Sequence, residues 1–262
     1  MKKGLIITAV ILILAGAVIF GAALFAVDFD FTRLDTAKYV TNTYTLDGAI
    51  DTFDINTVDA DIRFRPSEDG TLKVVCVEQE NVRHQVKAEN GALKITVSDT
   101  RDIKDRVAIF SFSSPSVTVY LPSGDYAALK VSAVSGNISV PGPLYIGEVQ
   151  LSVTTGDIEC TELSCKTLTL TGTTGDVKLK NSVASESFYI KLNTGDVRFD
   201  NCDAAQITVK TTTGDVKGTL RSDKVFIAKA TTGKVSVPDT VSGGQCEITT
   251  TTGDIKISIV KD

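Results

Sequence analysis

The chain has 262 residues, which suffices for one or two domains with a hydrophobic core. Its 42% of apolar and 23% of charged residues exclude a disordered chain, and a formal net charge of −5 without a basic cluster argues against nucleic-acid binding. His84 is the only histidine, so chemistry that relies on imidazole starts at a disadvantage, and the composition favours a scaffold over an enzyme.

The first predicted element is an apolar helix. Residues 4–27 carry no charge, and a helix of this length crosses the ~30 Å hydrocarbon core of a membrane. The segment exceeds the roughly 7–15 apolar residues of a signal peptide, although the small residues at 21–23 keep cleavage open as an alternative. Lys2 and Lys3 precede it and predict a cytoplasmic amino terminus with the remainder outside.

The next region combines one irregular coil with alternating strands. Residues 50–65 place apolar side chains on alternate positions, with Ala60 where later copies of the pattern have glycine. Residues 72–97 alternate as well, and Asn90-Gly91 is a favoured hairpin turn. We expect these antiparallel strands to cover the first edge of a repeated structure that follows.

A short motif, TGDI or TGDV with close variants, recurs every 19–20 residues to the end of the chain. Its glycines are Gly136, Gly156, Gly175, Gly195, Gly214, Gly233 and Gly253. Apolar residues alternate on both sides of each glycine, but the parity of the buried positions changes at the motif. A straight strand cannot change face, so the chain must turn a corner there, and glycine supplies the positive φ for it. The pattern predicts a β-solenoid of stacked coils.

The aspartates that follow these glycines are predicted to stack along one corner. They are Asp157, Asp176, Asp196, Asp215 and Asp254, and Lys234 interrupts the column. Charges ~4.8 Å apart in water repel by only about 0.9 kcal/mol, so the column is tolerable without a cation. The calcium-binding nonapeptide repeat is absent. We interpret the glycines and aspartates as a structural turn column rather than a metal site.

The final coil is apolar at its end. Ile255, Ile257 and Ile259 alternate just before the sequence stops at Asp262, and no capping element follows them in the sequence. An open strand edge is a template for pairing. We therefore expect these three isoleucines to mark a docking edge, either for self-association or for a partner's strand.

Cysteines and carboxylates give little sign of chemistry. The five cysteines are Cys76, Cys160, Cys165, Cys202 and Cys246, an odd count without a CxxC pair, which predicts neither a disulfide framework nor a zinc site. Glycosidases need two carboxyl groups ~5–9 Å apart in a cleft. The longest variable segments, at 141–143 and 239–245, contain no carboxylate pair, so we predict no catalytic residues, no metal and no cofactor.

The TTGDI and TTGDV motifs at this spacing, preceded by the strand and proline at 117–122, resemble a family of β-strand-repeat proteins. Its members are named as adhesins and have no established function. LiaG-like members of Gram-positive bacteria pair one amino-terminal transmembrane helix with this domain. The resemblance covers about residues 50–262 and implies the fold, and the family has no established catalytic residues to carry over.

We therefore predict an all-β chain in which a β-solenoid follows one transmembrane helix. The expected segments are a cytoplasmic end and anchor at 1–27, a stalk at 28–49, a first coil with a hairpin cap at 50–128 and seven coils at 129–262. The expected function is non-catalytic adhesion or interaction at the bacterial cell envelope. Its partners would be the bilayer, through residues 4–27, and a protein or cell-wall glycan, with no nucleic acid. An accessory role in envelope-stress signalling, bound to a membrane sensor, is the alternative, and a glycan-active enzyme ranks third.

Overall fold

The computed structural model describes residues 2–26, 28, 38–101 and 114–260, and the chain divides into two units. The first unit contains helix α1 (Lys2–Ala26), whose described side chains are almost all exposed. Within it, residues Thr8–Ala26 are long and apolar enough to cross a membrane, a property that a signal sequence shares. The predicted stalk lies partly outside the described residues, at 29–37.

The second unit is built from strands. They are β1 (Tyr39–Leu46), β2 (Thr52–Thr57), β3 (Asp61–Pro66), β4 (Leu72–Gln79), β5 (Val82–Glu89), β6 (Ala92–Asp99), β7 (Ser116–Leu121), β8 (Asp125–Ser135), β9 (Ile138–Thr155), β10 (Ile158–Thr174), β11 (Val177–Lys180), β12 (Val183–Thr194), β13 (Val197–Thr213), β14 (Val216–Leu220), β15 (Lys224–Thr232), β16 (Val235–Ser236), β17 (Gly244–Thr252) and β18 (Ile255–Ile259). The unit is all-β, as predicted from the alternating apolar residues.

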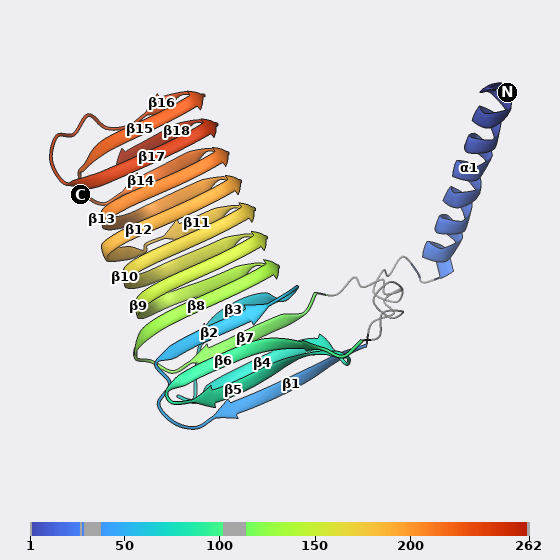
Figure 1. Cartoon of the computed structure of the whole chain (residues 1–262), viewed down its shortest axis with the longest axis horizontal. Helices are drawn as coiled ribbons and strands as arrows, with labels where there is room; N and C mark the ends of the chain where they lie inside the picture. Colours follow the sequence, from blue (N-terminus) through green and yellow to red (C-terminus); the bar gives the residue numbers. More distant parts are fainter. Residues whose placement is uncertain (1, 27, 29–37, 102–113, 261–262) are drawn as a thin grey trace. The chain divides into compact units, whose positions relative to one another are not determined.

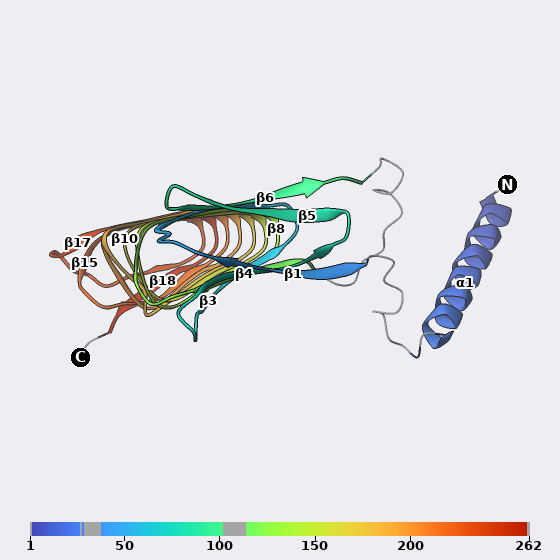
Figure 2. The ribbon, with the colours of Figure 1, turned by 90° about the horizontal axis from the view of Figure 1, so that it is seen from below.

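These strands form a solenoid-like stack of coils, each hydrogen-bonded to the next (Figure 1). The pairing is parallel, and equivalent residues of successive repeats lie side by side: Ile158 pairs with both Ile138 and Val177. Figure 2 shows the coils superposed as flattened ovals with one strand layer on either side. Alternate side chains of both layers point inward, because a strand that has one buried face must alternate.

One continuous hydrophobic core runs through the stack. Its largest fully buried side chains include Phe64, Phe188 and Ile55. The buried apolar residues lie between Phe53 and Ile257, so residues 38–262 contain the whole described core, and we expect this segment to fold without α1.

One end of the stack is covered by antiparallel strands. Beyond the β2–β3 coil, β6 pairs with β2 and β7 pairs with β3, and the antiparallel strands β5 and β4 follow on β6 and β7, respectively. β1 pairs with β4, so residues 39–46 are a strand of this unit, which corrects the expectation of a stalk over 28–49. The hairpin region therefore covers this end, although residues 102–113 lie outside the described part.

The coils near both ends do not follow chain order. The coil expected at 50–65 forms β2 and β3, which lie between β6–β7 and β8–β9. At the other end β17 pairs with both β13 and β15, and β18 pairs with both β14 and β16. The coil that is last in the sequence is therefore second to last in space, and β15–β16 forms the end of the stack.

Candidate functional site

The corner of each coil is made by the repeated glycine. The seven glycines have φ between 120° and 149°, a range that side-chain-bearing residues rarely adopt. A Cβ atom on Gly195 would lie 1.9 Å from the carbonyl oxygen of Gly175 in the neighbouring coil. Backbone conformation and close stacking therefore both require glycine at this corner.

The residues after the glycines form a ladder of side-chain to backbone hydrogen bonds. Each backbone N–H donates to the Oδ1 atom of the equivalent residue in the adjacent coil. The pairs are Asn137 to Asp61 at 2.8 Å, Asp157 to Asn137 at 2.9 Å, Asp176 to Asp157 at 2.8 Å, Asp196 to Asp176 at 2.9 Å, Asp215 to Asp196 at 2.9 Å and Asp254 to Asp215 at 2.7 Å. The ladder satisfies an amide that the corner would otherwise leave without a partner.

Lys234 ends this ladder. Its backbone N–H donates to Asp254 Oδ1 at 2.8 Å, and its own side chain has no oxygen to offer a further coil. The prediction that Lys234 interrupts the column is wrong, because the coil of Asp254 lies between those of Asp215 and Lys234. A lysine replaces the aspartate in the coil after which the described stack ends.

The second carboxylate oxygens of Asp196 and Asp215 carry ion pairs. Lys217 contacts Asp215 Oδ2 at 2.5 Å, and Arg198 contacts Asp196 Oδ2 at 3.3 Å. The hydrogen bond from Lys217, aided by the Asp254 amide, lowers the pKa of Asp215. Both oxygens of these carboxylates therefore have partners within the fold, which is the arrangement of a structural column.

The predicted docking edge lies elsewhere than expected. Ile255 and Ile257 are buried, and Ile259 is partly buried against the core. β18 pairs along its whole length with β14, and Ile255 also pairs with Val235 of β16. The coil of these isoleucines is therefore not the last one in space: Ile255 lies between β14 and β16, whereas Ile257 and Ile259 pair with β14 alone among the described strands.

Among the described residues, metal-ligating side chains gather in a group of three or more at one place, formed by Cys76, Glu78 and His84 at the covered end. Glu78 is fully buried, and its Oε2 atom accepts the backbone N–H of His84 at 2.5 Å and lies 2.7 Å from the His84 ring Nδ1. Asn42 of β1 donates to Oε1 at 2.6 Å. This buried cluster joins β1, β4 and β5 at the covered end of the stack, and the His84 Nε2 atom has no hydrogen-bond partner among the described residues.

All five cysteines are buried and free of disulfides. Burial raises the pKa of Cys165 and of Cys246 to about 12, and burial with the nearby Glu78 charge raises that of Cys76 to about 12. Burial also raises the pKa values of Cys160 and Cys202. Protonated, buried thiols are poor nucleophiles and poor metal ligands, so the cysteines act as small core residues.

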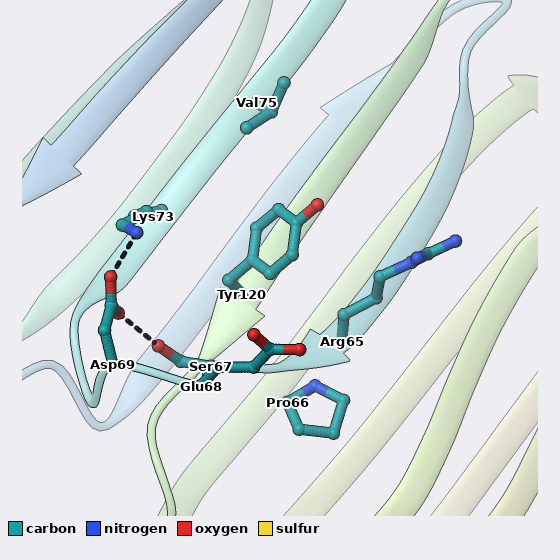
Figure 3. A pocket seen from close by; sticks show the side chains of 8 residues that line it. All are labelled: Arg65, Pro66, Ser67, Glu68, Asp69, Lys73, Val75 and Tyr120. Carbon is teal, nitrogen blue, oxygen red and sulfur yellow. Dashed lines mark hydrogen bonds and ion pairs between the residues drawn. The ribbon is translucent and has the colours of Figure 1, made fainter.

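An open basin of about 710 Å³ lies on the outer surface near the covered end. Figure 3 shows Tyr120 of β7 at its centre, with Arg65 on one side, Lys73 on the other and the Glu68 carboxylate below. Lys73 pairs with Asp69, and this hydrogen bond is the main reason that the pKa of Asp69 lies well below its ordinary range. Within the described part of the chain, Arg65 and Glu68 have no ion-pair partner.

Sequence reasoning missed this basin. Its residues come from the end of β3, the turn into β4, β4 itself and β7, which meet because β7 pairs with both β3 and β4. The sequence shows a charged turn at 65–73, but no sequence pattern predicts that Tyr120 lies near this turn. The basin therefore depends on long-range strand pairing.

Comparisons with known proteins identify the fold. A model of a family described as Toastrack DUF4097 matches residues 50–259. The comparison with curated proteins found no match. A crystal structure from Parabacteroides distasonis described as a "putative lipid binding protein" is 12% identical, covers 86% of this chain and 98% of its own, and has a TM-score of 0.50. A "putative adhesin" from the same species is 14% identical, with 85% and 98% covered and a TM-score of 0.49. At such identities the likeness concerns the fold alone.

Proposed function

Since this chain belongs to the Toastrack DUF4097 family, we propose that it is a non-catalytic, membrane-anchored β-solenoid that acts as an adhesion or interaction module at the bacterial cell envelope. The ladder carboxylates accept backbone hydrogen bonds within the stack, the cysteines are buried, and the Nδ1 atom of His84 contacts Glu78. Recognition then falls to the outer surface, which suits a binding module better than a catalyst. Some solved structures that resemble this chain are described as adhesins and one as a lipid-binding protein.

The observation that carries the proposal is the basin around Tyr120. It combines an aromatic ring with a cation, Arg65, and a carboxylate, Glu68, that lack ion-pair partners in the described structure. Arg and carboxylate side chains hydrogen-bond to hydroxyl and amide groups, and the tyrosine ring offers an apolar contact with a polar tip. Such a surface fits a cell-wall glycan, whose sugar rings carry both kinds of group.

Sedimentation with purified cell walls tests the proposal. The soluble segment 38–262 should co-sediment with isolated cell-wall sacculi, and Tyr120→Ala or Arg65→Ala should weaken this binding about tenfold or more. Tyr189→Ala is the matched control, because Tyr189 is a half-exposed tyrosine on the other strand layer, far along the stack. Equal binding by the Tyr120 and Tyr189 variants would argue against the basin as the recognition site.

The anchor and its orientation are tested separately. We infer an uncleaved helix with a cytoplasmic amino terminus, supported by the length of α1 and by Lys2 and Lys3 before it. Protease added to wall-stripped cells should release the strand unit while a cytoplasmic marker stays intact. Amino-terminal sequencing that begins after residue 23 would show a cleaved signal peptide instead.

A further inference from the structure

The coil at the end of the stack has an open side. β15 pairs with β17 and β16 pairs with β18, and among the described residues no strand pairs with the opposite edge of either one (Figure 1). The other end of the stack is covered by the β4–β5 hairpin and β1. The carbonyl oxygen of Lys224, the first residue of this nine-residue strand, accepts a hydrogen bond from Thr240 Oγ1. Beyond Lys224, the open edge of β15 is a template for another strand.

The core is exposed at this end. Phe226 and Ala228 occupy inward positions of β15 but are only partly buried. Their neighbours in β17, Cys246 and Ile248, have no exposed surface. The inward side chains of β15 are therefore covered by a neighbouring coil on one side only, whereas those of interior coils are covered on both sides.

The laterally paired residues on the outward face become apolar at the same coil. Tyr189, Thr208 and Glu247 are lateral neighbours on successive strands, and the next residue in the row is Ile227. Ile227 is 54% exposed. Val225 beside Gln245 repeats the change. Apolar outward residues at the open edge extend the contact surface around the exposed core.

The charges of this end are balanced. Residues 223–243 expose two carboxylates, Asp223 and Asp239, and two ammonium groups, Lys229 and Lys234. The remaining charge, Lys224, is buried and pairs with Asp203 at 2.6 Å. Although the whole chain has a net charge of −5, this end can meet an identical end without net charge repulsion.

We propose that β15 pairs antiparallel with β15 of a second copy, across a two-fold axis at Ala228. This arrangement pairs residues 225–231 of both strands and sets the large Phe226 opposite the small Ala230 of the second copy. It also sets Ile227 opposite Lys229, so the two Lys229 side chains do not face each other. A two-fold contact closes both open edges at once and leaves a dimer rather than a filament.

The dimer goes beyond the proposed function and does not depend on it, because the basin lies near the other end of the stack. An adhesion module that joins two copies through their ends would present a basin at each far end. Failure of cell-wall binding would not contradict the proposed dimer, and a monomeric protein would not contradict the proposed role of the basin. The two proposals can therefore be told apart.

Sedimentation of the soluble segment 38–262 tests the proposal first. We expect a dimer at micromolar concentrations. Ile227→Lys places like charges opposite each other in two symmetric pairs and should weaken dimerisation about tenfold. Ile227→Glu, the matched control, faces Lys229 of the second copy and should weaken it less. A monomeric parent protein, or equal weakening of dimerisation by both variants, would overturn the proposal. A monomer is the result expected if a strand of another protein occupies this edge.

Crosslinking tests the axis. In an Ala228→Cys variant the new thiol meets its counterpart across the two-fold axis, within the 4.4–6.8 Å Cα separation of disulfides, where antiparallel pairs are roughly 4.5–5.5 Å apart. Mild oxidation should give a covalent dimer that Ile227→Lys reduces. Lys191→Cys, an exposed position on β12 inside the stack, should crosslink much less. Equal crosslinking at both positions would overturn the register.

Discussion

The substitution Gly195→Ala places a methyl group where the structure has no room for one. The Cβ atom would lie 1.9 Å from the Gly175 carbonyl oxygen and 2.6 Å from its carbonyl carbon, both backbone atoms of a paired coil. The φ of 146° at Gly195 adds conformational strain of about 2 kcal/mol for an alanine. The two coils must therefore separate at this corner.

Separation weakens the hydrogen bonds that cross the corner. The Val177 N–H donates to the Asp196 carbonyl oxygen at 2.9 Å, and the Asp196 N–H donates to Asp176 Oδ1 at 2.9 Å. Losing two bonds of about 1 kcal/mol each brings the total cost to about 4 kcal/mol. For a domain of this size that cost lowers the melting temperature by about 8–16 °C.

Thermal unfolding of residues 38–262, followed by far-ultraviolet circular dichroism, measures this effect. Gly124→Ala is the control, because Gly124 has no positive φ and a Cβ there meets nothing within 4 Å. We expect the control to stay within about 0.5 kcal/mol of the parent. A Gly195→Ala variant that melts within about 2 °C of the control would refute the stacked-corner reasoning.

Three further predictions follow from the ladder and the cysteines. Asp196→Ala leaves the Asp215 N–H without its acceptor and should lower the free energy of unfolding by about 1–2 kcal/mol in chemical denaturation. Asp196→Asn should lower it less, because Asn137 fills the same role in its own coil. Equal losses for the two variants would contradict this prediction. A thiol reagent at about pH 8 should label none of the five buried cysteines until denaturant is added, and rapid native labelling would contradict their burial. The pKa of Asp215 is lowered in the folded state, so its stabilising pairing is complete above the unfolded pKa and is lost as the pH falls through the folded pKa. The melting temperature of the parent should therefore fall more steeply below about pH 4 than that of Asp215→Asn, and parallel curves would exclude this contribution.

The coil architecture could be predicted from the sequence because each coil repeats a local rule. Alternation, the parity change at the motif and the glycine at the corner all act within one coil, as Gly195 and its flanking Ile190 and Val197 illustrate. The same local rule made the order of the last coils unpredictable. The coils of Gly233 and Gly253 carry the same pattern, so either one can pair with the coil of Gly214.

Two features of the sequence distinguish the last two coils once the structure is known. Lys234 lacks the carboxylate that an interior ladder residue offers to its neighbour, whereas Asp254 has it. Ile227 is apolar in an outward row where Glu247 is charged. Both differences assign the coil of Gly233 to the end of the stack. The basin had no comparable signal, since Tyr120 reaches Arg65 only through the β3–β7 pairing.

The exchanged order of the last two coils also shapes the edge that we propose for dimerisation. β15 follows β14 and leads through β16 into β17, so the chain is tied to the stack on both sides of the exposed strand. An edge held in this way is already in the extended conformation that pairing needs, and less conformational entropy is lost when a second strand docks. The β17–β18 coil must occupy its place between β13–β14 and β15–β16 before β15 is held there. The edge is therefore completed only when the β17–β18 coil has folded, which links self-association to the integrity of the whole stack.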